Sequence, residues 1–173
     1  MSGAKIEVFI PAARIAERVA ELGAQISTDY AGQSVVVVGV LKGSFMFMAD
    51  LVRHLSIPVR LDFMGTKSYV GTTSSGQVQI TKDLDKPVEG EHVLLVEDII
   101  DTGLTLSYLR RNLEQRRPRS LKTIAFLDKP SQRKVEIQAD YVGFEIENRF
   151  VIGYGLDFEQ QYRQLPDLCV LAG

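Results

Sequence analysis

The sequence has one cysteine, no apolar run long enough to cross a bilayer and almost no net charge. Cys169 has no second cysteine with which to form an internal disulfide, which argues against a disulfide-stabilised secreted fold. A formal net charge of −2 gives no sign of a surface for nucleic acids or membranes. No basic segment followed by an apolar run begins the chain. We therefore expect a cytoplasmic protein with no nucleic-acid or membrane partner.

Repeats, low-complexity tracts and linkers are also lacking, and 173 residues suffice for one hydrophobic core. We therefore expect a single domain over residues 1–173. Within it, Cys169 lies in an apolar run and is interpreted as a small core residue.

Apolar patterns predict an alternation of helices and strands. Residues 35–41 form a continuous, mostly β-branched run, typical of a strand buried on both faces. The alternation predicts an α/β fold with a mainly parallel, twisted sheet flanked by helices. The expected helices are 11–30, 44–55 (capped by Ser44) and 105–116, and the expected strands are 35–41, 59–64, 78–81, 93–96, 121–127, 141–146 and 150–153, with a mobile loop over 71–76.

Ligands of such sheets bind beyond the carboxyl ends of the strands. Four candidate sites are expected to meet at that edge: Lys42, residues 97–105, Lys129 and Asp157.

The segment 93–105 carries the strongest chemical signal, because an apolar strand is followed by carboxylates, hydroxyls and a glycine. Glu97 and Asp98 are expected to leave the strand first, suited to bind vicinal hydroxyls or a hard cation. Asp101 is suited to take or give a proton. The Thr-Gly-x-Thr step at 102–105 begins a helix and suits an anion. An acidic surface turn before a capped helix is the alternative, but the buried strand and the Thr-Gly-x-Thr step favour ligand binding.

Residues 96–105, Val-Glu-Asp-Ile-Ile-Asp-Thr-Gly-Leu-Thr, resemble the 5-phosphoribosyl-1-pyrophosphate (PRPP) motif of type I phosphoribosyltransferases. The Glu-Asp-Ile-Ile-Asp-x-Gly form resembles the hypoxanthine-guanine branch in its bacterial form. The resemblance extends to Leu-Lys-Gly-Ser at 41–44, Lys-Ser-Tyr at 67–69, Leu-Asp-Lys-Pro at 127–130 and Phe-Val-Ile-Gly-Tyr-Gly-Leu-Asp at 150–157.

The resemblance implies a type I phosphoribosyltransferase fold with a small hood formed by the terminal segments and a flexible lid over about 65–80. It implies a purine salvage enzyme that converts hypoxanthine or guanine and PRPP to the nucleoside monophosphate and pyrophosphate, with Mg²⁺. Glu97 and Asp98 would hold the ribose, and Asp101 would be the general base at purine N7. Asp101, Thr102, Gly103, Leu104 and Thr105 would form the 5′-phosphate pocket. Some relatives carry lysine in place of Leu104, so the phosphate here has one fewer cation.

Other roles follow from the same resemblance. Lys42, Gly43 and Arg163 would bind pyrophosphate, often with a cis peptide between residues 41 and 42. Glu97, Asp98 and Asp157 would lie at Mg²⁺. The implied purine site has Lys129 as donor to the 6-oxo group, Phe150 stacked on the ring, Val151 at the base edge and Asp157 nearby, while Ser68 and Tyr69 form the tip of the lid.

Taken singly, several of these residues have plain structural interpretations: Lys42 and Lys129 as surface lysines, Phe150 as a core aromatic. Two other functions also stay open. One is a regulator of the same fold that binds nucleotides and RNA, and the other is a sibling enzyme that prefers xanthine. The family suggests a homodimer or homotetramer.

Overall fold

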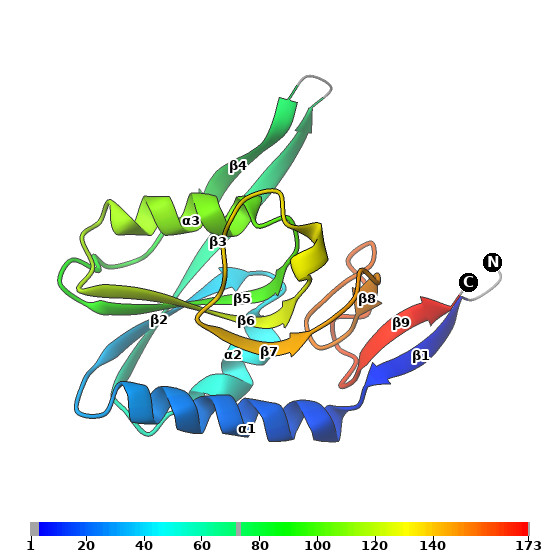
Figure 1. Cartoon of the computed structure of the whole chain (residues 1–173), viewed down its shortest axis with the longest axis horizontal. Coiled ribbons are helices and arrows are strands. Elements are labelled where there is room, and N and C mark those ends of the chain that lie inside the picture. The colour runs from blue at the N-terminus through cyan, green and yellow to red at the C-terminus, as the bar shows by residue number, and fades with distance from the viewer. Residues whose placement is uncertain (1–3, 72–73, 173) are drawn as a thin grey trace.

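The computed structural model describes residues 4–71 and 74–172 (Figure 1). Three α-helices lie in this part of the chain: α1 (Ala12–Asp29), α2 (Phe45–Val52) and α3 (Leu104–Glu114), with a short 3₁₀ turn at Pro130–Gln132. The strands are β1 (Lys5–Ile10), β2 (Val35–Leu41), β3 (Val59–Gly71), β4 (Ser74–Lys82), β5 (His92–Ile100), β6 (Ser120–Asp128), β7 (Tyr141–Glu145), β8 (Val151–Ile152) and β9 (Leu168–Ala172). In the described segments, no helix is both long and apolar enough to cross a membrane.

A six-stranded sheet in the order β4-β3-β2-β5-β6-β7 forms the centre of the molecule. The pairs β2–β3, β2–β5, β5–β6 and β6–β7 are parallel, and only β3–β4 is antiparallel. This confirms the predicted α/β fold with a mainly parallel sheet. Because β2, β3, β5 and β6 run in the same direction, their carboxyl ends lie at one edge of the sheet.

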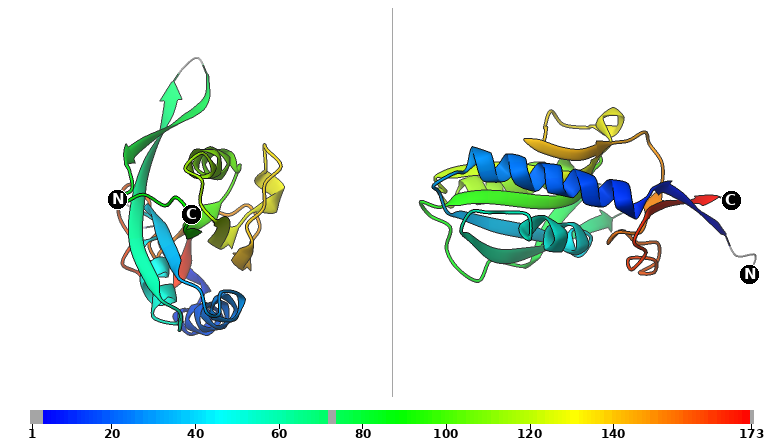
Figure 2. Two further views of the ribbon diagram at one scale, coloured as in Figure 1. Left: turned by 90° about the vertical axis from the view of Figure 1, so that its left-hand side faces the viewer. Right: turned by 90° about the horizontal axis from the view of Figure 1, so that it is seen from below.

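Helices cover both faces of this sheet, with α1 and α2 on one side and α3 on the other (Figures 1 and 2). Alternate residues of β2 divide between the two hydrophobic cores: Val35 and Val37 belong to one, and Val36, Val38 and Val40 to the other. Successive side chains of a strand point to opposite faces. A strand between two helical layers therefore needs an unbroken apolar run, as predicted for residues 35–41.

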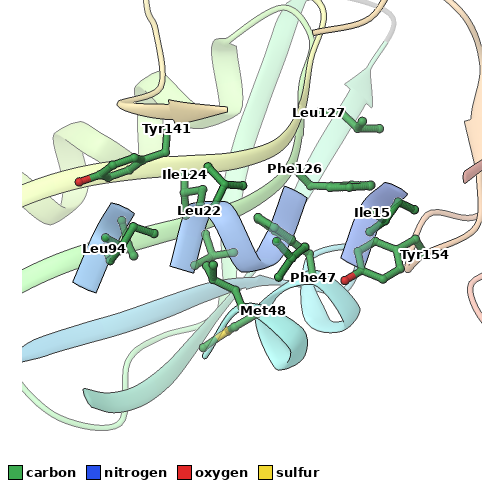
Figure 3. Packing of buried hydrophobic residues seen from close by; sticks show 14 of the residues in the cluster. Ile15, Leu22, Phe47, Met48, Leu94, Ile124, Phe126, Leu127, Tyr141 and Tyr154 are labelled. Atoms are coloured by element: carbon green, nitrogen blue, oxygen red, sulfur yellow. The ribbon is translucent and has the colours of Figure 1, made fainter. Parts of the chain in front are cut away.

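Phe126 of β6 joins several elements in the larger core (Figure 3). Its ring centroid lies 5.3 Å from that of Phe47 in α2, 5.9 Å from Phe144 in β7 and 4.9 Å from Tyr154 in the loop after β8. These edge-to-face and tilted contacts are favourable for aromatic rings. They fix the loop after β8 against the sheet.

The two ends of the chain form a second sheet, of which the sequence patterns predicted only the strand at 150–153, which corresponds to β8. It is three-stranded and antiparallel in the order β1-β9-β8, and it projects beyond the central sheet (Figure 1). The interpretation of Cys169 is confirmed, because this residue of β9 is buried and unpaired. β1 was missed although polar and apolar residues alternate in Lys-Ile-Glu-Val-Phe-Ile, because so short a pattern is a weak signal without its partner strand.

Three local predictions need correction. The predicted short strand at 78–81 is part of a long hairpin, because β3 continues to Gly71 and β4 begins at Ser74; residues 72–73 of the expected mobile loop lie outside the described residues. β5 also continues to Ile100, so Glu97 and Asp98 lie within the strand rather than after it. Ser44 does not cap α2, because its buried hydroxyl donates to the carbonyl of Val40 at 2.6 Å.

Phe126→Ala would remove the ring that joins α2, β7 and the loop after β8. We expect the free energy of unfolding to fall by about 3–5 kcal/mol, the usual cost of deleting a buried aromatic side chain. Urea unfolding monitored by circular dichroism measures this change. A loss below about 1 kcal/mol would contradict a central packing role for the ring.

Candidate active site

A cleft of about 310 Å³ lies at the carboxyl ends of β2 and β5, beside Thr66 of β3. Parallel strands bring these ends together although they are far apart in the sequence. The lining includes most residues predicted to bind phosphate, ribose or metal. These are Lys42, Gly43, Glu97, Asp98, Asp101, Thr102, Gly103, Thr105, Asp157 and Arg163.

The loop after β2 packs closely against two other parts of the cleft. The peptide between Leu41 and Lys42 is cis. A Cβ atom at Gly43 would overlap the carboxylate of Asp98, and one at Gly155 would overlap the carbonyl oxygen of Gly43. Close approach of three chain segments therefore requires glycine at both positions.

Glu97 and Asp98 are adjacent carboxylates in the lining of the cleft. Only 5% of Glu97 is exposed. Burial, with repulsion from Asp98, raises the pKa of Glu97 well above its ordinary value. Burial also raises the pKa of Asp98 to about 6, although the Ile99 N–H and the charge of Arg163 favour its ionised form. Glu97 is buried and Asp98 half-buried, and too little positive charge compensates the two carboxylates, so the site favours hydrogen-bond donors and cations.

The loop from Asp101 to Leu104 leads into the N-terminus of α3. Gly103 has a φ of +84°, in the left-handed region, and a Cβ atom there would lie 2.6 Å from Cγ2 of Ile137. The Leu104 N–H donates to the hydroxyl of Thr102 at 3.3 Å. The first N–H groups of a helix lack intrahelical acceptors, so this end of α3 suits an anion. Asp101 itself is exposed to solvent within the cleft.

Asp157 and Arg163 enter the cleft from the segment between β8 and β9. Their side chains form an ion pair at 3.3 Å. Arg163 also donates to the carbonyl of Gly155 at 2.7 Å, and the N–H of Gly155 donates back to the carbonyl of Arg163 at 2.9 Å. A predicted metal ligand and a predicted pyrophosphate ligand are therefore partners in the ligand-free protein.

The carboxylates of the cleft suit Mg²⁺ only if substrate phosphates and water supply the other ligands. Among the described residues, no three His, Cys, Asp or Glu side chains cluster closely enough to hold a metal ion by themselves. Mg²⁺ commonly keeps several waters and binds through one or two carboxylates together with substrate phosphates. The raised pKa values of Glu97 and Asp98 reflect charge that a cation would compensate, so the donor set fits this shared mode.

Among the described residues, five predicted site residues do not line this cleft: Ser68, Leu104, Lys129, Phe150 and Val151. The side chain of Tyr69 lies outside the part of the chain that the structure describes. Lys129 is only 7% exposed, and its N–H donates to the carbonyl of Ile100 at 2.9 Å, which places its backbone beside the Asp101 loop. Phe150 is 57% exposed and packs edge-to-face on Phe158, with centroids 5.7 Å apart.

Leu104 is the first residue of α3, and the remaining residues of this group lie in strands. Val151 is in β8 and pairs with Val170. Ser68 and Tyr69 belong to β3 and pair with Val78 and Gln77 of β4, in the projecting hairpin.

Sequence reasoning missed Thr66, which lines the cleft from β3. A single threonine in a strand carries no signal of function by its type or spacing. Its place in the cleft depends on the parallel register that sets Val40 of β2 against Met64 and Leu41 against Gly65.

Comparisons with known proteins agree with this fold. A family model described as "Phosphoribosyl transferase domain" matches residues 11–159. The chain is 49% identical over 166 residues to the hypoxanthine-guanine phosphoribosyltransferase of Bacillus subtilis, with 95% of this chain and 92% of that protein covered. It is 51% identical over 164 residues to the hypoxanthine phosphoribosyltransferase of Haemophilus influenzae, with 92% of each covered.

A crystal structure of a hypoxanthine-guanine phosphoribosyltransferase from Bacillus anthracis superposes with a TM-score of 0.93 at 43% identity, covering 96% of this chain and 98% of that one. The chain therefore belongs to the phosphoribosyltransferase family, in the branch of the hypoxanthine and hypoxanthine-guanine enzymes. The predicted family resemblance is confirmed.

Asp98→Asn is expected to stabilise the ligand-free protein at neutral pH. The folded-state pKa of about 6 exceeds the ordinary value of 3.8, so ionisation of Asp98 costs stability progressively as the pH rises from about 4 to about 6. At pH 7 the variant should gain about 3 kcal/mol in free energy of unfolding. Loss of the Asp98 charge also removes its repulsion of Glu97, which acts in the same direction. Urea unfolding at several pH values measures the difference, which should shrink towards pH 4. A gain independent of pH would contradict this explanation.

Proposed function

We propose that the protein transfers the phosphoribosyl group of PRPP to hypoxanthine or guanine, releasing the nucleoside monophosphate and pyrophosphate in purine salvage. The observation that carries the proposal is a single cleft that combines buried carboxylates, a helix N-terminus and the loop after β2. The names of the similar enzymes support the choice of hypoxanthine and guanine.

The loop from Asp101 to Thr105 binds the 5′-phosphate of PRPP. Backbone N–H groups at the start of α3 and the hydroxyls of Thr102 and Thr105 are the donors, and Leu104 contributes its backbone. Glu97 and Asp98 accept hydrogen bonds from the ribose hydroxyls. Support comes from the burial of Glu97 and the half-burial of Asp98, which reduce competition from water and strengthen such bonds.

Lys42, Gly43 and Arg163 bind the pyrophosphate leaving group. Glu97, Asp98 and Asp157 would hold Mg²⁺, which would supply positive charge beside the pyrophosphate leaving group. Support comes from the Asp157–Arg163 ion pair, which Mg²⁺ and pyrophosphate would separate into two new pairs.

Purine recognition belongs to the residues beside this cleft. Lys129 donates to the 6-oxo group, which excludes adenine because adenine presents a donor at that position. Phe150 stacks on the ring, and its exposed face supports this role. Val151 offers backbone groups to the base edge, next to Asp157. Asp101 takes the proton from N7 while the purine nitrogen forms its bond to the ribose.

The hairpin of β3 and β4, which carries Ser68 and Tyr69, is the lid over the cleft. The course of β3 supports this assignment, because Thr66, two residues before Ser68 in the same strand, is part of the cleft lining. Closure would keep water from a ribosyl cation-like transition state. The sheet of β1, β8 and β9 is the hood, since β8 lies just before the segment that carries Asp157.

The protein works in the cytoplasm as a homodimer or homotetramer. Large apolar side chains exposed on the strands support self-association: Ile6 and Val8 on β1 and Leu61 on β3.

A panel of hypoxanthine, guanine, xanthine, adenine and orotate, each with Mg²⁺ and PRPP, tests the proposed reaction. We expect turnover of hypoxanthine or guanine and none of adenine or orotate, measured by the change in absorbance as the nucleotide forms. Preference for xanthine would identify the sibling enzyme instead. Absence of turnover with every base would refute the proposed activity and favour a nucleotide-binding regulator.

Asp101→Asn is expected to lower turnover by about 10²-fold, because the variant cannot accept the N7 proton. PRPP affinity, measured by calorimetry, should be retained, since the backbone of the loop is unchanged. Asp85→Asn is the matched control: its side chain is exposed and lies outside the cleft, so turnover should stay at the wild-type level. Wild-type turnover in Asp101→Asn would remove this residue from the role of base.

A further inference from the structure

Arg133 lies outside the lining of the cleft, and all three nitrogens of its guanidinium group donate hydrogen bonds to neighbouring segments of the chain. Its Nε donates to the carbonyl of Ile137 at 3.0 Å. Its Nη2 forms an ion pair with Asp128 at 2.5 Å. The side chains of Arg133 and Asp128 are 15% and 12% exposed, so this pair is largely shielded from water.

The third nitrogen, Nη1, faces three carbonyl oxygens from two separate segments. It lies 3.0 Å from the oxygen of Asp101, 3.4 Å from that of Ile100 and 3.3 Å from that of Lys129. The guanidinium group of Arg133 therefore links the backbone of Asp101, the proposed proton acceptor, to the backbone of Lys129, the proposed donor to the 6-oxo group.

The segment that follows Arg133 supports the same loop by independent contacts. The N–H of Lys134 donates to the carbonyl of Thr102 at 2.8 Å. Gly103 lies against Ile137, Val135 and Arg133, where a Cβ atom would be 2.6 to 3.3 Å from their side chains. Residues 133–137 thus form a support beneath the Asp101 loop, with Arg133 at its centre.

Arg133 is not among the residues that line the cleft. Any effect of its side chain on the reaction must therefore pass through the groups that it holds. Only arginine carries a planar fork with donors on three nitrogens, whereas lysine concentrates its donors on one atom. The four carbonyls and one carboxylate around Arg133 match such a fork.

We propose that Arg133 is a positioning residue that fixes Asp101 and Lys129 relative to each other, so that N7 and the 6-oxo group of one purine meet both groups at once. This inference rests on the proposed function. It explains how a loop for the sugar phosphate and a loop for the base stay in register without a ligand.

The kinetic test compares Arg133→Gln and Arg133→Lys with wild type. We expect Arg133→Gln to lower kcat by about 10²-fold, as for a misplacement of about 1 Å at the reacting groups. KM for PRPP should change by a smaller factor, because most contacts of the phosphate and pyrophosphate sites remain. Arg133→Lys should fall between the two, since it keeps the charge but loses the fork. Wild-type kcat in Arg133→Lys would contradict the requirement for arginine geometry.

Double-mutant cycles separate positioning from a general loss of stability. If Arg133 acts through Asp101 or Lys129, the effect of Arg133→Gln should be smaller in the Asp101→Asn or the Lys129→Ala background than in wild type. Equal factors in all backgrounds would overturn the proposal. Arg110→Gln is the matched control, because Arg110 also contacts a hydroxyl, a carbonyl and carboxylates, but at the opposite end of β6. It should leave kcat unchanged.

Amide hydrogen exchange supplies a readout that does not depend on activity. In Arg133→Gln, the amides of Lys129 and Lys134, which bond to Ile100 and Thr102, should exchange faster relative to the core amides of β2. Unchanged protection of both amides would overturn the positioning role. Wild-type protein that turns over no base would refute the proposed function, while the exchange result would still decide whether Arg133 holds the loop.

Discussion

The pair of carboxylates near the end of β5, one buried and one half-buried, is the constraint on which the rest of the site depends. Glu97 and Asp98 follow a run of residues, 93–96, that belongs to the two hydrophobic cores, so their charges are held where water is scarce. The raised pKa values of both groups express that cost. These two carboxylates lower the stability of the free protein, and a hydroxyl donor or a cation that binds to them would relieve this destabilisation and so bind more tightly. Functional sites commonly have this arrangement.

The cleft is assembled by close approach rather than by a dense network of side-chain bonds. Gly43 lies against Asp98, and Gly155 lies against the backbone of Gly43. The ion pair of Asp157 and Arg163 closes the same side. Polar groups in the cleft therefore stay available to a ligand, while the geometry is set by backbone packing and by groups behind the cleft such as Arg133 and Asp128.

Long apolar patterns predicted their elements well, because burial on both faces of a sheet demands an unbroken run. The strand at 35–41 was predicted with the bounds that the structure has, and the helix at 11–30 differs by one residue at each end. Short or amphipathic strands were not predicted so well. β1 and β9 stabilise each other across almost the whole length of the chain, and the hairpin of β3 and β4 is held by its pairing, so local pattern alone underestimates them.

The sequence by itself determined the family and the α/β class, and it singled out the residues proposed to carry chemistry, because these depend on residue type and on local spacing such as that in residues 96–105. The tertiary structure alone decided which of these residues share one cleft and which lie beside it. It also decided that Glu97 and Asp98 remain within β5, that Thr66 joins the lining and that Arg133 holds two loops together. Such facts depend on contacts between segments far apart in the chain, and no local pattern encodes them.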